Sequence, residues 1–327
     1  MADRKVKPDW YLVSLVCAAE EDLVEAAEAF DEFLDSVEYF QPPDGFGGTP
    51  PKSEMDFLRR DLRRSVANYR GWHFAGSKEA AVLDDLSELG GRSFVASLTN
   101  ELPVLQAAYA SRLPTPLSED VHLAVARVFA SREDYVSYVG ADRKWSAAVW
   151  CPDRRELVAF YPESGDEALL KTVRHEALHQ YLSYAASMVT AAPWFNEGHA
   201  ELFEHTHFDG YGNLLFDIDR DAAAFVHDNA EALAEYLPAF VALDYDAFYA
   251  NSGTDAQRRA NYDLAWSIAY FLEVGAPEVR FRPFESLRAD YLRHLLEKKD
   301  YAAATRAVFT DDMLKKFIAE WLKFWKK

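Results

Sequence analysis

Two histidines and a glutamate within five positions are the strongest chemical signal in the sequence. His175, Glu176 and His179 form the pattern His-Glu-Ala-Leu-His. Residues four apart on a helix project from the same face, so both imidazoles can reach one metal ion. Glu176 then lies beside that ion, where its carboxylate can take a proton from a water activated by Zn²⁺. The pattern predicts a hydrolytic zinc centre; the alternative is a helix with two ordinary histidines.

A catalytic zinc needs a third protein ligand, and an acidic stretch downstream can supply it. Glu197 follows His179 by 18 positions, which leaves room for a second helix to return to the site. Pro193 is well placed to open that helix. Glu201, one turn beyond Glu197, can accept a hydrogen bond from the second ring nitrogen of a ligating histidine. Taken alone, the two acids fit a solvated helix face better, and Glu204 would continue that face; beside HEALH, they supply the ligand that it lacks.

These stretches resemble the gluzincin zinc metallopeptidases. The resemblance rests on HEALH and WFNEGHAELFE, because in those enzymes the two histidines of HExxH and a glutamate of an N-E-G-x-A-type motif bind zinc. It implies Zn²⁺ ligands at His175, His179 and Glu197 and a general base at Glu176. It also matches Glu201 to an acidic residue that, in some branches of the family, lies next to the zinc ligands without binding the metal.

A wider resemblance covers the chain from about Val121 to Trp325. Over this range the sequence is most similar to the peptidase-MA-like domains of unknown function found in bacterial proteins, which are often exported. It includes YDLAWSIAYFL and the closing helical stretch. The chain has no G-x-M-E-N type motif before the zinc helix, so the resemblance does not imply aminopeptidase activity. His199 stands where such motifs more often have an aromatic or aliphatic residue.

Peptide hydrolysis also requires a group that stabilises the oxyanion of the tetrahedral intermediate. Tyr262 follows the third ligand at a distance comparable to that of the tyrosine used by several related aminopeptidases. Its alternative role is core packing, because Trp266 and Tyr270 follow it at helical spacing. Tyr245 and Tyr249 are weaker candidates for the same role.

The elements expected around these residues form an α+β protein. Alternation of β-branched residues predicts a strand over Val121–Phe129, and two short apolar runs predict a hairpin over Ser146–Tyr161. Helical patterns follow at Asp166–Met188, which carries HEALH, at Trp194–Glu204, and through most of the chain beyond. The expected architecture is a zincin-like core, in which a small mixed sheet and the zinc helix lie above a helical C-terminal bundle.

The sequence divides into a mostly helical N-terminal region, residues 1–117, and a metallopeptidase-like domain, residues 118–327. The second comprises the sheet and zinc helix (118–190) and a helical part (191–327). Helices are expected in the first at Glu20–Phe40, Met55–Tyr69, Glu79–Leu89 and Phe94–Ala110. Basic residues before the apolar run Trp10–Ala19 loosely resemble a signal peptide, although a buried strand fits better. The compartment stays open: cytoplasmic as the sequence stands, or exported if a signal peptide has been removed.

Composition narrows the remaining choices. The 327 residues include 54 acidic and 35 basic ones, a formal charge of -19, which disfavours nucleic acid and anionic membranes as partners. No apolar run reaches the roughly 20 residues that span a bilayer. Cys17 and Cys151 are too few for a cysteine zinc cage and are expected to be buried thiols. Thirteen acids but one basic residue lie between Glu176 and Ala250, a pattern that fits cationic substrates, metal binding or simple solubility.

The sequence therefore predicts a zinc-dependent peptidase whose substrate adds as a strand along the edge of the hairpin Ser146–Tyr161. Two other functions stay open. One is a binding or assembly module that retains a peptidase-like shell without turnover. The other is a zinc hydrolase of non-peptide amides or esters. Glu176 argues against the first, because a structural zinc site needs no base.

Overall fold

The computed structural model describes residues 54–327, apart from 88, 117–121, 145, 163–165, 210, 212 and 250–252. The chain divides into two units, and all described residues belong to the one from Lys52 to Lys327. The expectations for Trp10–Ala19, Cys17 and Glu20–Phe40 lie outside the described residues.

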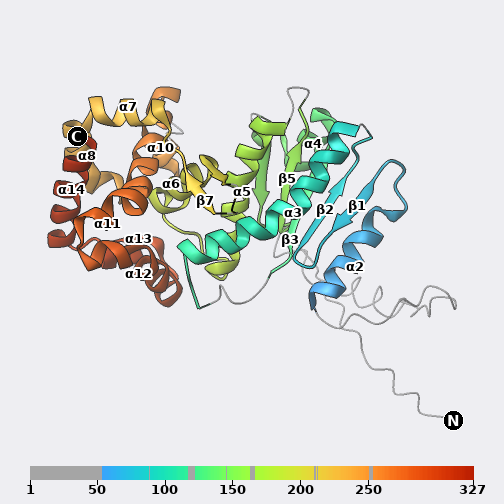
Figure 1. Ribbon diagram of the computed structural model, residues 1–327, viewed down its shortest axis with the longest axis horizontal. Coiled ribbons are helices and arrows are strands. Elements are labelled where there is room, and N and C mark those ends of the chain that lie inside the picture. The colour runs from blue at the N-terminus through green and yellow to red at the C-terminus, as the bar shows by residue number, and fades with distance from the viewer. Residues whose placement is uncertain are drawn as a thin grey trace, which may run out of the picture. The chain divides into compact units, whose positions relative to one another are not determined.

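A five-stranded mixed sheet with the spatial order β1-β2-β3-β5-β4 forms one part of this unit (Figure 1). Its inner pairs, β2 with β3 and β3 with β5, are parallel, and its two outer pairs are antiparallel. The bounds are β1 His73–Gly76, β2 Ala80–Asp84, β3 Ala124–Phe129, β4 Ala148–Cys151 and β5 Glu156–Phe160. The hairpin expected over Ser146–Tyr161 is confirmed as β4 and β5, and β4 is an edge strand.

Helices cover both faces of the sheet. Side chains alternate along a strand, and in β2 Ala80 and Val82 join the main core with α3 (Leu89–Arg112) and α5 (Asp166–Ala185). Ala81 and Leu83 pack on the opposite face, with Val66 of α2 (Glu54–Ala67). α4 (Arg132–Val139) covers that same side and is capped by Ser131, whose hydroxyl accepts the N–H of Asp134. The helix α5, which carries HEALH, is thus a core element of the sheet layer.

The expectation of a helix over Glu79–Leu89 is wrong. The segment contains β2, whose five residues are all buried. A strand covered on both faces shows a continuous apolar run instead of alternation, and a short run of that kind cannot be told from a buried helix by period. The stretch before residue 118 therefore supplies β1, β2 and α3 to the same sheet layer.

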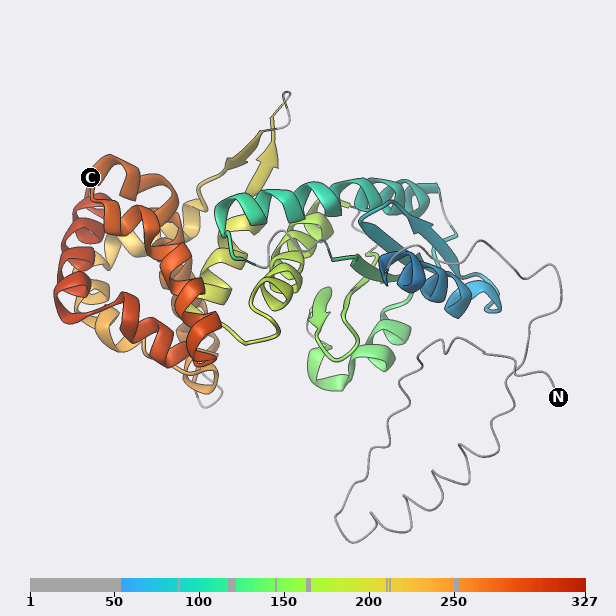
Figure 2. The same ribbon diagram turned by 90° about the horizontal axis from the view of Figure 1, so that it is seen from below.

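The C-terminal part is helical, as expected, except for one antiparallel hairpin. The hairpin consists of β6 (Thr206–Phe208) and β7 (Leu214–Phe216) and projects from the neighbouring helices (Figure 2). The helices are α6 Pro193–Glu204, α7 Arg220–Asp228, α8 Ala230–Phe240, α9 Tyr245–Phe248, α10 Asp255–Tyr270, α11 Ala276–Val279, α12 Arg282–Lys298, α13 Tyr301–Val308 and α14 Asp311–Trp325, with a π-helical turn at Phe271–Gly275. Among the described helices, none is long and apolar enough to cross a bilayer.

Gly198 sets the spacing between α6 and α10. A Cβ atom at this position would lie 2.4 Å from the carbonyl oxygen of Ala265, closer than any side-chain carbon can approach. Only glycine therefore allows these two helices to pack at this distance. Because α6 carries Glu197 and α10 carries Tyr262, the close approach fixes both candidate side chains relative to each other.

Candidate metal centre

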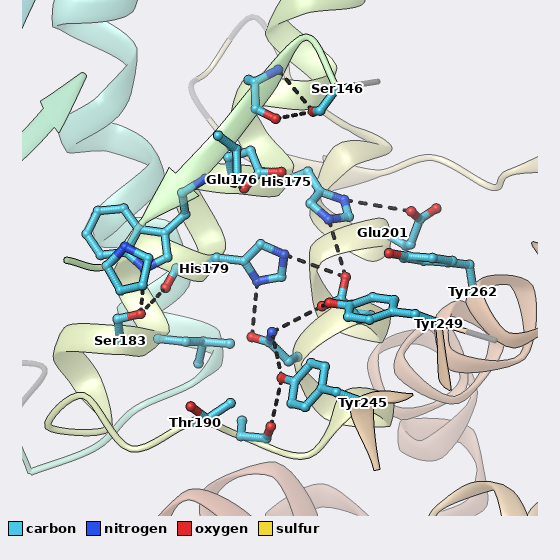
Figure 3. A pocket seen from close by; sticks show the side chains of 18 of the residues that line it. Ser146, His175, Glu176, His179, Ser183, Thr190, Glu201, Tyr245, Tyr249 and Tyr262 are labelled. Carbon is cyan, nitrogen blue, oxygen red and sulfur yellow. Dashed lines mark hydrogen bonds and ion pairs between the residues drawn. The ribbon is translucent and has the colours of Figure 1, made fainter. Parts of the chain in front are cut away.

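Three expected ligands from α5 and α6 lie close together. The Nε2 atoms of His175 and His179 each lie 3.6 Å from Oε2 of Glu197. Ligand atoms bound to one tetrahedral zinc at about 2.0–2.2 Å stand roughly 3.3–3.6 Å apart. Two imidazoles and one carboxylate are also a donor set that catalytic zinc sites use. The donor set and these two distances are therefore compatible with Zn²⁺; Figure 3 shows both histidines facing the cleft.

Two other groupings of potential ligands occur around the same histidine. The atoms of His175, Glu176 and His179 lie within 4.8 Å of one another, as do those of His175, Glu201 and Glu204. Glu197 is not part of either grouping, but a single oxygen of its carboxylate is equidistant from Nε2 of both imidazoles. Glu201 and Glu204 instead approach Nδ1 of His175.

The imidazole of His175 is oriented by Glu204. Its Nδ1–H donates to Oε2 of Glu204 at 3.1 Å, whereas Oε1 of Glu201 lies at 3.7 Å. Glu201 and Glu204 follow Glu197 on one face of α6, at the fourth and seventh positions after it. Of the two, Glu204 lies closer to Nδ1 of His175. A hydrogen bond at Nδ1 fixes the tautomer that leaves Nε2 free to bind a metal.

The imidazole of His179 is oriented by Asn196, a residue that the sequence did not single out. Nδ1–H of His179 donates to Oδ1 of Asn196 at 3.1 Å. The amide nitrogen of Asn196 donates in turn to Oε1 of Glu197 at 3.2 Å and to the hydroxyl of Tyr245 at 3.1 Å. The signal that could have revealed it is the asparagine directly before the glutamate in WFNEGHAELFE.

The two carboxylate oxygens of Glu197 have different surroundings. Oε1 accepts the hydroxyl of Tyr249 at 2.9 Å and the amide of Asn196, while Oε2 faces the histidines. Burial alone would raise the pKa of Glu197, but His179, His175 and the Tyr249 hydroxyl outweigh it and lower the pKa to about 2. Glu197 is thus an ionised ligand held in place.

Glu176 joins the zinc helix to the edge strand. Its Oε2 accepts the backbone N–H of Trp150 in β4 at 2.6 Å. Burial raises the pKa of Glu176 above its ordinary value, although the nearby His179 and His175 oppose the shift. A carboxyl group with a raised pKa suits the exchange of a proton with a substrate.

Three tyrosines form the wall opposite α5 (Figure 3). Tyr249 donates to Glu197, and the hydroxyl of Tyr245 donates to the carbonyl of Ala191 at 2.9 Å. The ring of Tyr262 lies 6.4 Å from that of Tyr249. Burial, with the charge of Glu197 added, raises the pKa of Tyr262 well above its ordinary value. It therefore stays a neutral hydrogen-bond donor at any ordinary pH.

The ligands open into a cleft of about 940 Å³. Its walls are α5 with β4 on one side, and α6, α10 and the segment Met188–Ala191 on the other. Sites that bind small organic ligands usually measure about 300–1,000 Å³. The cleft is therefore large enough for a short stretch of a peptide.

The remaining histidines of this stretch lie outside the metal site. His199 is fully buried, and its Nδ1–H donates to the carbonyl of Phe195 at 2.7 Å. Burial, helped by the charge of Arg288, lowers the pKa of His199 to about 3, so it is a neutral core residue. His205 and His207 each pair with an aspartate, Asp219 and Asp217 respectively. Cys151 is a buried free thiol, as expected.

Comparison with known proteins adds no relative to this picture. No family model matches the chain, and no curated protein shows significant similarity to it. The interpretation of the site consequently rests on its residues and their geometry.

Proposed function

We propose that this chain is a zinc-dependent peptidase. One observation carries the proposal: Nε2 of His175 and Nε2 of His179 each lie 3.6 Å from Oε2 of Glu197, while the other polar atom of each side chain is engaged by the protein. Such orientation of the ligands by outer partners is typical of functional metal sites.

Glu176 is the proposed general base. Zinc held by three protein ligands supplies a Lewis acid and lowers the pKa of water to about 7. Glu176 follows the ligand His175 directly, so its carboxylate can take a proton during attack on a carbonyl and return it to the leaving amine. The hydrogen bond from the N–H of Trp150 holds the carboxylate in position.

Tyr262 is the proposed donor to the oxyanion. Tyr245 donates its hydroxyl proton to the carbonyl of Ala191, and both Tyr249 and Tyr262 interact through their hydroxyls with Glu197. Tyr262 lines the same cleft from α10. A neutral hydroxyl that faces the reacting carbonyl stabilises the negative charge that develops there.

The open edge of β4 is the proposed binding surface for the peptide backbone. Ala147 and Val149 direct their backbone groups toward β5. In an antiparallel pair the intervening residues direct theirs outward, as the bond from Trp150 N–H to Glu176 illustrates. The outward groups of Ala148 contact the hydroxyl of Ser146. A substrate strand would replace that contact and pair with the edge.

Metal analysis combined with hydrolysis of a mixed peptide library tests the proposal. We expect one zinc per chain, hydrolysis that stops with a chelator, and a Glu176→Gln variant that keeps the zinc but loses hydrolysis. A protein that takes up no zinc after reconstitution would refute the metal site. Zinc without peptide hydrolysis would refute the peptidase, and tests with esters and simple amides would then separate another hydrolase from a binding module.

A further inference from the structure

The charged residues that line the cleft fall into two groups. The acids are Glu176, Glu197, Glu201 and Glu204, all part of the metal centre or its immediate surroundings. The basic residues are arginines from outside that centre: Arg143, Arg258 and Arg259. The acid-rich stretch from Glu176 to Ala250 thus contributes acids to the cleft only at the proposed metal centre. The hypothesis that this stretch attracts a cationic substrate therefore gains no support from the cleft. Arg259 also interacts electrostatically with Glu201 and Glu204 at the border of that centre.

Arg259 is the most firmly held of these arginines. Its Nε lies 2.8 Å from Oδ1 of Asp263, and one terminal nitrogen, Nη2, lies 3.2 Å from Oδ2 of Asp219. The side chains of both aspartates are nearly buried, at 8% and 11% exposure, whereas that of Arg259 is 54% exposed. Two inner carboxylates therefore fix the guanidinium plane. Its other terminal nitrogen, Nη1, has no ion-pair partner among the described residues.

The position of Arg259 on α10 places it beside the proposed reaction centre. Arg259 precedes Tyr262 by three residues, so the two side chains share one face of the helix, and both line the cleft. Arg258 lines the cleft as well; its Nε donates to the carbonyl of Tyr249 at 2.9 Å. Two adjacent guanidinium groups thus stand on the wall that carries the proposed oxyanion donor.

We infer that Arg259, with Arg258 next to it, binds a carboxylate of the substrate and so selects peptides that present one near the scissile bond. The inference rests on the proposed function. A guanidinium fork binds a carboxylate through paired hydrogen bonds, and an arginine fixed in advance loses little freedom in doing so. The carboxylate belongs either to an acidic side chain or to the C-terminus of the peptide, and both offer the same chemistry.

Equilibrium binding to the Glu176→Gln protein tests this inference separately from turnover. Three fluorescent peptides of equal length are compared by anisotropy in the presence of zinc: a neutral one with an amidated C-terminus, the same peptide with one internal glutamate, and the neutral peptide with a free C-terminus. We expect one of the two carboxylate peptides to bind about tenfold more tightly than the neutral amide. The preferred peptide identifies the source of the carboxylate.

Substitution of Arg259 then assigns the preference. Arg259→Gln in the same background should abolish it and leave the affinity for the neutral amide within about twofold. Arg293→Gln is the matched control, because Arg293 also pairs with two acids, Asp290 and Glu297, and is 49% exposed, but lies outside the cleft. This control should leave all three affinities unchanged.

Loss of Arg259 removes the ion-pair partner of Asp263 and one of the partners of Asp219, which keeps His205, so folding is checked by thermal melting. The double variant Arg259→Gln with Asp263→Asn removes one of those charges and should also show no preference. Equal affinities of the Glu176→Gln protein for all three peptides would overturn the inference, and so would a preference that survives in a folded Arg259 variant. If all three peptides are hydrolysed equally, the carboxylate-binding inference is rejected and the proposed peptidase activity stands. If a carboxylate peptide is preferred but no peptide is hydrolysed, the peptidase proposal is rejected and carboxylate binding stands.

Discussion

Replacement of Asn196 by alanine should weaken zinc binding even though this residue is not a ligand. Asn196 accepts the Nδ1–H of His179 at 3.1 Å and donates to Oε1 of Glu197 at 3.2 Å, so it orients two of the three ligands at once. Each hydrogen bond contributes about 0.5–1.5 kcal/mol net, which gives a loss of about 1–3 kcal/mol. That range agrees with the roughly 10–100-fold loss of metal affinity typical for removal of such a partner.

Competition with a chromophoric chelator measures the zinc affinity of each variant. Asn229→Ala is the matched control, because the amide of Asn229 makes one exposed hydrogen bond, to the carbonyl of Phe225, and lies outside the cleft. Asn196→Asp separates the two contacts. It keeps an acceptor for His179 but places a second carboxylate against Glu197, so we expect an affinity between those of the parent and Asn196→Ala.

Zinc affinity unchanged in Asn196→Ala would refute the reasoning, because it would mean that His179 and Glu197 need no orientation. A loss of zinc that accompanies a large drop in the melting temperature of the metal-free protein would count against it as well. The Asn229→Ala control removes one exposed hydrogen bond and leaves the contacts of Tyr245 intact, so its melting temperature provides the reference.

Three further predictions address the proton donor, the helix contact and the partner of His175. Tyr262→Phe should lower kcat about 10²–10³-fold with intact zinc content; an unchanged kcat would confine Tyr262 to packing. Gly198→Ala should lower the free energy of unfolding in urea by about 1–3 kcal/mol, because its Cβ would meet the Ala265 carbonyl at 2.4 Å; Gly90→Ala, which would meet only a hydroxyl at 3.4 Å, should not. Glu204→Ala should weaken zinc binding about tenfold, and Glu201→Ala less, since only Glu204 is hydrogen-bonded to His175; the reverse order in the chelator titration would restore Glu201 as the partner.

The sequence predicts best what depends on local geometry. His175 and His179 share a helix, so their common direction follows from the period of the helix alone. Glu197 lies on another helix, and its distance to both imidazoles depends on how α5 and α6 pack. Its selection from the sequence relied on the resemblance and on the need for a third ligand. In the structure Oε2 of Glu197 lies 3.6 Å from Nε2 of both histidines, and its role as a ligand stays a prediction.

The contacts that hold the ligands could not be read from spacing. Glu201 and Glu204 lie on the same face of α6, and side-chain reach decides which one meets His175. Asn196 directly precedes a ligand, where a helical period gives no reason to expect a contact with α5. The orientation of these groups depends on tertiary packing, which one sequence specifies but does not display.

The same distinction applies to charge. Counted along the chain, the region around the zinc motifs is acidic, and Arg258 and Arg259 fall outside it. In the folded protein α10 packs against α6, and these arginines join the wall of the cleft. In the proposed site the nearby acids serve as metal ligand, base or histidine partner, so they would offer little to a cationic substrate. The cleft combines helices from distant parts of the sequence, since α10 begins more than fifty residues after the end of α6. A local excess of one charge in the sequence is therefore a poor guide to the charge that a substrate meets in the cleft.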